Sequence, residues 1–127
     1  MLKEGSAETD IRVGKIKEGW LVKRSRILKE WKKRWMVLTR THLYSFEQQG
    51  VYRAPTEKIP LKEVSTIKSF YKNQYERPQV FRIESDDTYF YLSAQDHQDK
   101  WAWMTAIEKM TESISNPIAQ DSQNLIR

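Results

Sequence analysis

The sequence predicts a mainly β domain, a seven-stranded, partly open antiparallel β-barrel or sandwich capped by one C-terminal amphipathic α-helix. Short segments in which apolar and polar residues alternate recur along most of the chain, and turn residues separate them. Close to the C-terminus the apolar spacing changes to steps of three and four, which is typical of a helix. The length of 127 residues suits one such domain and is short for two.

Alternation with a period of two defines the strands. It is clearest in the second segment, where Lys32, Arg34, Met36 and Leu38 share one face and the residues between them take the other. Seven short strands at close spacing are typical of an antiparallel barrel or sandwich. The predicted strands are residues 19–23, 32–39, 42–46, 58–61, 64–70, 79–84 and 88–93.

One helix is predicted to follow the last strand. Ser93 begins a stretch that resembles a helix cap, with Asp96 three residues further on. The apolar stripe of this helix must be buried, and the open end of the barrel offers the nearest apolar surface. The stripe consists of Trp103, Ile107, Met110 and Ile114.

The chain divides into three segments. Residues 1–15 are polar and lack a sustained period, so we expect a flexible leader. The domain is expected over residues 16–114. Residues 115–127 are rich in Ser, Asn and Gln, so we expect a flexible C-terminal tail. No run reaches the roughly 18 apolar residues of a membrane-spanning helix, and the lack of Cys excludes disulfides and thiolate metal sites.

The positive charge is concentrated in one stretch. The chain has a net charge of +5, but residues 23–34 hold seven basic residues against one acidic residue, a net charge of +6. The rest of the chain therefore carries −1. An anionic ligand is expected to bind at this stretch.

Five segments resemble the pleckstrin homology (PH) domain family, and they stand in the family's order. In the family's helix one Trp packs over the barrel, and the spacing to Ile107 identifies that residue as Trp103. The resemblance covers about residues 16–114 and implies the PH-like superfold and a non-catalytic binding module. The segments are residues 18–23, 31–38, 59–61, 90–93 and 100–107.

The resemblance also implies a phosphoinositide site. The family's signature is a Lys at the end of the first strand, a variable loop, then a basic residue, any residue and an Arg. Lys23, Lys32 and Arg34 match it here. All three lie on the core-facing side of their strands, so they are expected to line the mouth of the barrel and hold headgroup phosphates. Diffuse attraction to the membrane is expected from Arg24, Arg26, Lys29 and Lys33.

Two bulky apolar residues stand in the middle of the basic loop. Ile27 and Leu28 occupy positions where turns usually carry Gly, Asn or Asp. Such a pair exposed on a hairpin tip has no role in water but is favourable in an interfacial lipid layer. We therefore predict that Ile27 and Leu28 insert into the membrane.

Several departures from the family pattern indicate modest affinity. The third strand of tight-binding members often supplies a Tyr to a phosphate, but Ser45 occupies that place here, and Tyr44 is expected to point to the opposite face. The predicted hairpin turn at residues 85–87 contains two Asp, which would repel phosphate. Glu30 lies within the basic loop itself.

Other functions remain open on the sequence alone. The main alternative is a protein-protein interaction module on the same superfold with little lipid binding, for which the aromatic loop at residues 71–77 is a candidate contact. A third option is that the basic run is only a solvated hairpin. Nucleic-acid binding, suggested by the pI of about 9.4, is disfavoured because the charges cluster on one hairpin and the aromatic residues do not follow them.

No enzyme is expected, since the sequence lacks a nucleophile–base–acid arrangement and a glycine-rich phosphate loop. His42 and His97 are single and far apart, so no metal and no cofactor is expected. The sequence thus predicts a monomeric signalling or adaptor module in the cytoplasm. It would be recruited as a peripheral protein to the cytosolic face of phosphoinositide-containing membranes, with a protein partner as a further option.

Overall fold

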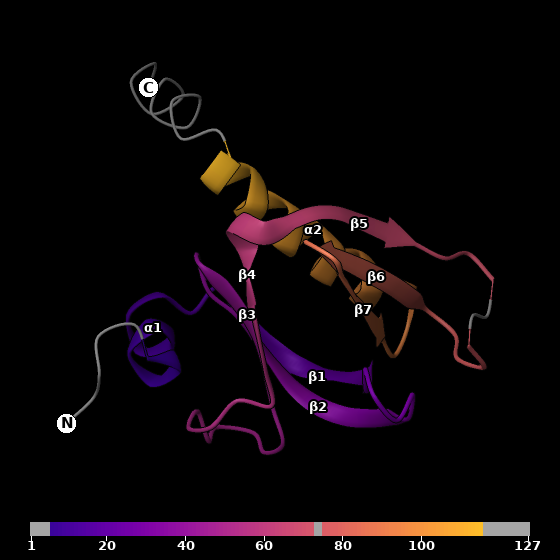
Figure 1. Ribbon diagram of the computed structural model, residues 1–127, viewed down its shortest axis with the longest axis horizontal. Helices are drawn as coiled ribbons and strands as arrows, with labels where there is room; N and C mark the ends of the chain where they lie inside the picture. Colours follow the sequence, from indigo (N-terminus) through magenta and orange to yellow (C-terminus); the bar gives the residue numbers. More distant parts are fainter. Residues whose placement is uncertain (1–5, 73–74, 116–127) are drawn as a thin grey trace.

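Seven antiparallel strands form one open sheet with a C-terminal helix, as predicted (Figure 1). The computed structural model describes residues 6–72 and 75–115. The strand order is β4-β3-β2-β1-β7-β6-β5, so β4 and β5 are the edges. The elements are α1 (Ala7–Gly14), β1 (Lys17–Arg24), β2 (Trp31–Leu38), β3 (His42–Phe46), β4 (Glu57–Pro60), the 3-10 turn η1 (Leu61–Glu63), β5 (Val64–Ser69), β6 (Val80–Ser85), β7 (Thr88–Ser93) and α2 (His97–Ser115).

The sheet bends between β1 and β7. Strands β1 and β2 pair over eight residues, whereas β1 and β7 pair only at Val22–Ser93 and Lys23–Leu92. The two halves, β1–β4 and β5–β7, therefore turn toward each other and enclose one core (Figure 1). The core is formed by the inward-facing apolar residues of both halves, among them Leu21, Met36, Leu38, Leu43, Phe81 and Ile83.

Helix α2 closes one end of this core. Trp103 is 1% exposed and belongs to the core cluster, as the apolar stripe predicts. Its ring packs over Gly19 on β1, where an added Cβ would lie 3.5 Å from the ring, an ordinary van der Waals contact. Met110 and Ile114 pack against the same core at its margin. Trp101, which lies off the stripe, is 63% exposed.

The predicted cap of α2 was wrong. Ser93 is still paired with Val80 in the sheet, and its hydroxyl donates to the Pro78 carbonyl at 2.7 Å. Asp96 caps the helix instead, since its Oδ1 accepts from the backbone N–H of Asp99 at 2.7 Å. The strand therefore extends to the point where we predicted the helix to begin.

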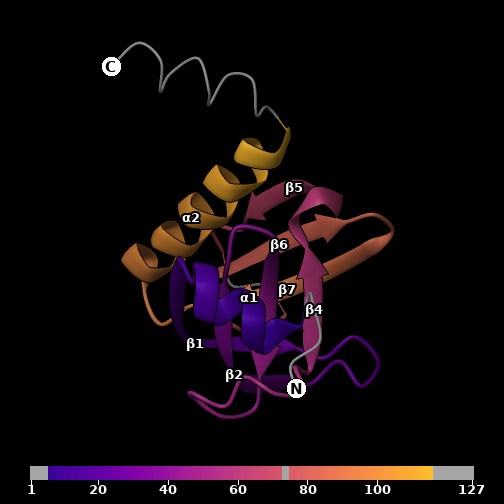
Figure 2. The ribbon, with the colours of Figure 1, turned by 90° about the vertical axis from the view of Figure 1, so that its left-hand side faces the viewer.

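Part of the predicted flexible leader is a helix. The Ser6 hydroxyl caps α1 by accepting from the backbone N–H of Thr9 at 3.2 Å. Ala7 and Ile11 are buried against the outer face of the sheet (Figure 2), where burial of an Ile contributes about 1.5–3 kcal/mol. The remaining predicted leader, residues 1–5, and residues 116–127 of the predicted tail lie outside the described residues. Ala7 and Ile11 form a second apolar cluster, separate from the main core, with Trp35, Val37, Tyr44, Phe46 and Tyr52.

A partly buried carboxylate fixes α1 to the sheet. Asp10 Oδ2 accepts from the hydroxyls of Thr39 at 2.6 Å, Tyr44 at 2.8 Å and Thr41 at 2.9 Å. Burial by itself raises the pKa of Asp10, but the three hydroxyl donors and nearby His42 outweigh it, so the pKa lies below its ordinary value of 3.8. The ionised form of Asp10 therefore stabilises the fold.

This pKa shift predicts a pH-dependent contribution of Asp10. Because the pKa is lowered on folding, the stabilisation is complete above about pH 4 and is lost as the pH falls through the folded-state pKa. Asp10→Asn should lower the free energy of unfolding by about 1–3 kcal/mol at pH 7, and this deficit should shrink toward pH 3. Urea unfolding at both pH values measures it. Glu8→Gln on the same helix is the matched control, and an equal deficit for both variants at both pH values would contradict the prediction.

Candidate functional site

The register of the β1–β2 hairpin gathers three of its cations on one face. Lys23 is directly opposite Lys32, and Leu21 is opposite Arg34. Since Leu21 is buried in the core, this register puts all three cations on the inner face of the sheet, just beyond the last packed apolar residue. The structure thus brings Lys23, Lys32 and Arg34 together, as the sequence predicted.

These side chains line an open hollow between the β1–β2 loop and the start of β4, which we call the mouth hollow. Its volume of about 480 Å³ is within the roughly 300–1,000 Å³ range of small-molecule sites. Ile27 and Leu28 form its apolar rim. The polar lining residues are Lys23, Ser25, Arg26, Lys32, Arg34, Thr56 and Glu57.

Lys23 is the most buried of these cations. Only 7% of the residue is exposed, and its ammonium group lies 5.8 Å from the centre of the Phe90 ring. A buried charge needs a partner, because loss of hydration is costly. Glu57 supplies it, with an Oε1 atom 3.1 Å from Lys23 Nζ.

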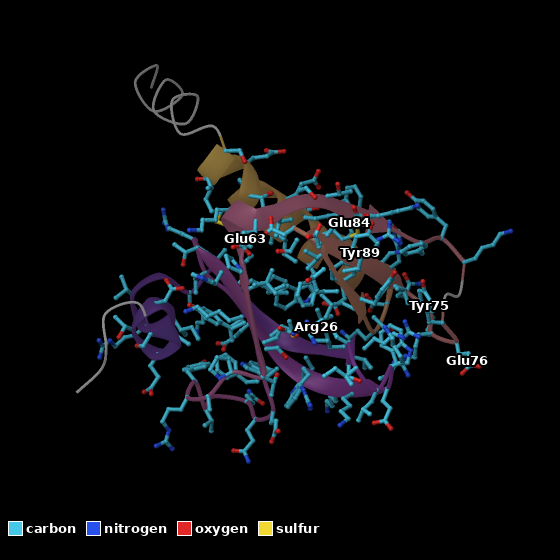
Figure 3. All side chains as sticks on the ribbon, in the orientation of Figure 1. Arg26, Glu63, Tyr75, Glu76, Glu84 and Tyr89 are labelled. Atoms are coloured by element: carbon cyan, nitrogen blue, oxygen red, sulfur yellow. The ribbon has the colours of Figure 1, made fainter. Side chains whose placement is uncertain are left out.

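Arg26 binds the same carboxylate in a two-pronged manner. Its Nε donates to Glu57 Oε1 and its Nη2 to Glu57 Oε2, both at 3.2 Å. In Figure 3 the labelled Arg26 lies between the two halves of the sheet. Arg26, which we predicted to provide only diffuse attraction, therefore lies in the mouth hollow together with Lys23.

The position of Glu57 is set by β4. Glu57 pairs with Ser45 on β3, and the neighbouring Thr56 donates from its backbone N–H to the Ser45 carbonyl at 2.7 Å. The Thr56 hydroxyl also donates to Ser45 Oγ at 2.8 Å. Ser45 is fully buried beneath this contact, and Tyr44 points to the opposite face, as predicted. There its hydroxyl donates to Asp10, a contact that the sequence did not indicate.

Lys32 and Arg34 are less constrained than Lys23. The closest acid to Lys32 is Glu30, with 3.9 Å between Lys32 Nζ and Glu30 Oε2. Arg34 is half-buried, and its Nη1 donates to the Lys33 carbonyl at 3.1 Å. Both side chains line the mouth hollow; Lys32 has only this long contact with Glu30, and Arg34 forms no salt bridge with another described residue.

Lys33, Arg24 and Lys29 lie elsewhere. Lys33 is on the outer face, with its ammonium 4.4 Å from the Trp20 ring centre. The guanidinium of Arg24 lies 4.4 Å from the centre of the ring of Tyr75, a residue of the loop between β5 and β6 that Figure 3 labels on the right. Arg24 and Lys29 line a second hollow on the other side of the loop, together with Tyr75, Asp87, Tyr89 and Tyr91.

The loop itself is a closed turn with an apolar tip. Ser25 N–H donates to the Glu30 carbonyl at 2.7 Å, and Lys29 adopts a positive φ of 60°. This closure turns the tip toward solvent, so that Ile27 is 90% exposed and Leu28 is 65% exposed. The exposure that the sequence suggested for this pair is therefore present.

Residues 6–72 and 75–115 form the part of the chain that the structure describes. This part has no group of three or more His, Cys, Asp or Glu that could hold a metal ion. None of its helices is long and apolar enough to cross a membrane.

The bent sheet, its capping helix and its basic mouth define the class of small helix-capped β-barrel domains. The family model described as PH domain matches residues 15–112, which is well over half of the chain. The chain therefore belongs to the PH domain family, and the resemblance seen in the sequence is confirmed. Helix α1 lies outside the matched residues.

Individual relatives agree with this assignment. Pleckstrin-2 from Homo sapiens is 30% identical over 92 residues, which cover 71% of this chain and 26% of that protein. Pleckstrin homology domain-containing protein 1 from Arabidopsis thaliana is 26% identical over 113 residues, which cover 86% of this chain and 77% of that protein. The chain thus spans about a quarter of pleckstrin-2, and it spans 20% of a PH domain-containing protein from Dictyostelium discoideum.

Solved structures share the fold. The crystal structure of the C-terminal PH domain of pleckstrin superposes with a TM-score of 0.67 at 25% identity, covering 77% of this chain and 98% of that one. The same domain in complex with D-myo-Ins(1,2,3,5,6)P5 has a TM-score of 0.67 at 24% identity and covers 76% and 95%. The Slm1-PH domain in complex with phosphoserine has a TM-score of 0.67 at 22% identity and covers 77% and 96%.

Proposed function

We propose that this PH domain is a non-catalytic membrane-targeting module that binds phosphoinositide headgroups through the β1–β2 hairpin. The observation that carries the proposal is the convergence of Lys23, Lys32 and Arg34 on one hollow at the end of the core. Arg presents a planar fork that fits phosphate oxygens, and Lys presents a mobile point charge. Arg26, already in the mouth hollow, adds a second fork.

The pleckstrin relationship supports this ligand class. The C-terminal PH domain of pleckstrin, which is 25% identical to this chain, has been solved in complex with an inositol pentakisphosphate. The Slm1-PH domain has been solved with phosphoserine, another phosphate monoester. A phosphate-bearing headgroup is therefore the ligand that we assign to the mouth hollow.

The affinity should be modest. Basic residues near an anionic leaflet contribute roughly 1 kcal/mol each, so the net charge of +6 on residues 23–34 contributes at most about 6 kcal/mol. That value lies between the free energies of millimolar and micromolar binding. We propose recruitment of a monomeric cytoplasmic protein to the cytosolic face of membranes, with headgroup contacts adding to the diffuse attraction.

A protein-binding role is the second candidate. Tyr71 is 88% exposed and Trp101 is 63% exposed, and both line a hollow where β5 ends and α2 begins. Strand β5 is also a sheet edge, the kind of element to which an extended peptide can add. This surface is separate from the mouth hollow, so the two functions can be tested independently.

Removal of two mouth cations should abolish headgroup-dependent binding. Lys23→Ala/Arg34→Ala should weaken sedimentation with phosphoinositide vesicles by about tenfold or more at near-physiological salt, because both side chains are assigned to the phosphates. Arg40→Ala/Lys62→Ala is the matched control, since it removes one Arg and one Lys near the opposite end of the sheet. Equal losses in both variants would mean that binding follows only net charge.

The outcome with wild type also separates the two candidate functions. Binding that ranks the phosphoinositide isomers and fails in the Lys23→Ala/Arg34→Ala variant supports the proposed function. Wild type that binds no phosphoinositide vesicle contradicts it and favours the surface around Tyr71 and Trp101.

The exposed tip should enter the lipid interface. Ile27→Ser/Leu28→Ser removes the apolar side chains without changing charge, so vesicle affinity should fall several-fold while binding of a soluble inositol phosphate stays the same. Vesicle sedimentation and calorimetry measure the two quantities. Val13→Ser/Val51→Ser, which removes two exposed but smaller apolar side chains from α1 and from the β3–β4 loop, is the control. Wild-type vesicle affinity in the tip variant would contradict insertion.

A further inference from the structure

A carboxylate already contacts two of the cations that line the mouth hollow. The two oxygens of Glu57 make one contact with Lys23 at 3.1 Å and two with Arg26 at 3.2 Å. These are the charge-assisted contacts that a bound phosphate group would make with the same side chains. The sequence did not indicate this residue, because it lies 34 positions from Lys23 and belongs to no recognisable motif.

Glu57 is held firmly in this position. Its side chain is only 14% exposed, and the β3–β4 pairing and the Thr56–Ser45 hydrogen bonds fix its backbone. The side chain can change rotamer, but the paired backbone keeps its carboxylate next to Lys23 and Arg26. A ligand must therefore compete with Glu57 for Lys23 and Arg26.

The free protein also needs this carboxylate. Lys23 and Lys32 stand directly opposite each other, and like charges in facing positions destabilise a sheet. Glu57 compensates for the buried member of the pair, Lys23. The same contact that stabilises the empty site thus opposes ligand binding.

We propose that Glu57 is an internal competitor that lowers the affinity of the mouth hollow and restricts it to phosphate monoesters. This inference rests on the proposed function. A monoester carries about −1.5 to −2 charge at neutral pH and displaces a carboxylate of charge −1 from two cations. A phosphodiester carries −1 and gains nothing by the exchange. Headgroups with phosphate monoesters are therefore the ligands, and diester lipids such as phosphatidylserine contact only the outer cations.

Glu57→Gln tests the competition directly. The amide has the same size but no charge, so the affinity for soluble inositol hexakisphosphate should rise by about tenfold. Glu30→Gln is the matched control, because it also removes one negative charge next to a mouth cation, but from a loop side chain that is 59% exposed and 3.9 Å from Lys32. Its affinity should change by less than about twofold, as expected for a loose surface pair. Calorimetry measures all three proteins.

Unfolding measurements give a second readout. Free Glu57→Gln should be less stable than wild type, since Lys23 then lies buried without its carboxylate, and the ligand should stabilise it more than it stabilises wild type. If Glu57→Gln does not fold, Glu57→Asp replaces it. The shorter side chain keeps the charge but weakens the fork with Arg26, and a smaller rise in affinity is expected.

The outcomes distinguish this inference from the proposed function. Suppose that wild type binds the ligand, that Lys23→Ala/Arg34→Ala does not, and that Glu57→Gln binds no more tightly than wild type. This result overturns the inference and leaves the proposed function in place. An equal gain in Glu30→Gln also overturns it, because a general charge effect then suffices. Binding that first appears in Glu57→Gln supports the competition, and absence of binding in both wild type and Glu57→Gln overturns both proposals.

Discussion

Lys23 and Lys32 face each other across the β1–β2 hairpin, immediately beyond Leu21 and the packed core. Two like charges in this position require a counter-anion, above all because Lys23 is almost completely buried. Glu57 is that anion in the free protein, and a headgroup phosphate is the one that we propose in the bound state. The stability of the empty domain and its capacity to bind are therefore linked through a single carboxylate.

The outer face of the same half-sheet has a separate support. Helix α1 covers Trp35, Val37, Tyr44 and Phe46, and Asp10 ties it to β3. Strand alternation places Tyr44 on this outer face, where it binds Asp10 of α1. The next residue, Ser45, lies on the inner face and contacts Thr56, which lines the mouth hollow. The rigid β2–β3 framework between them holds the hairpin cations in register.

Local patterns were sufficient for much of the structure and insufficient where distant residues meet. The alternation around Lys32 and the stripe through Trp103 depend on neighbours in sequence, so the strands, the helix and the facing cations were predictable. Glu57 reaches Lys23 only because β4 pairs with β3, and α1 is stable only because the sheet offers it an apolar face. Neither fact is visible in a local pattern. Asp96, not Ser93, caps α2 because sheet pairing extends through Ser93.

The most direct test of the central claim is a map of backbone amide chemical shifts during titration with soluble inositol hexakisphosphate. The account predicts that the largest changes fall on the residues that line the mouth hollow but not the second hollow, which are Lys23, Ile27, Leu28, Lys32, Arg34, Thr56 and Glu57. Changes centred on Tyr75, Tyr89 and Tyr91, across the loop, would place the ligand in the other hollow. Such a result would contradict both the assigned site and the role of Glu57.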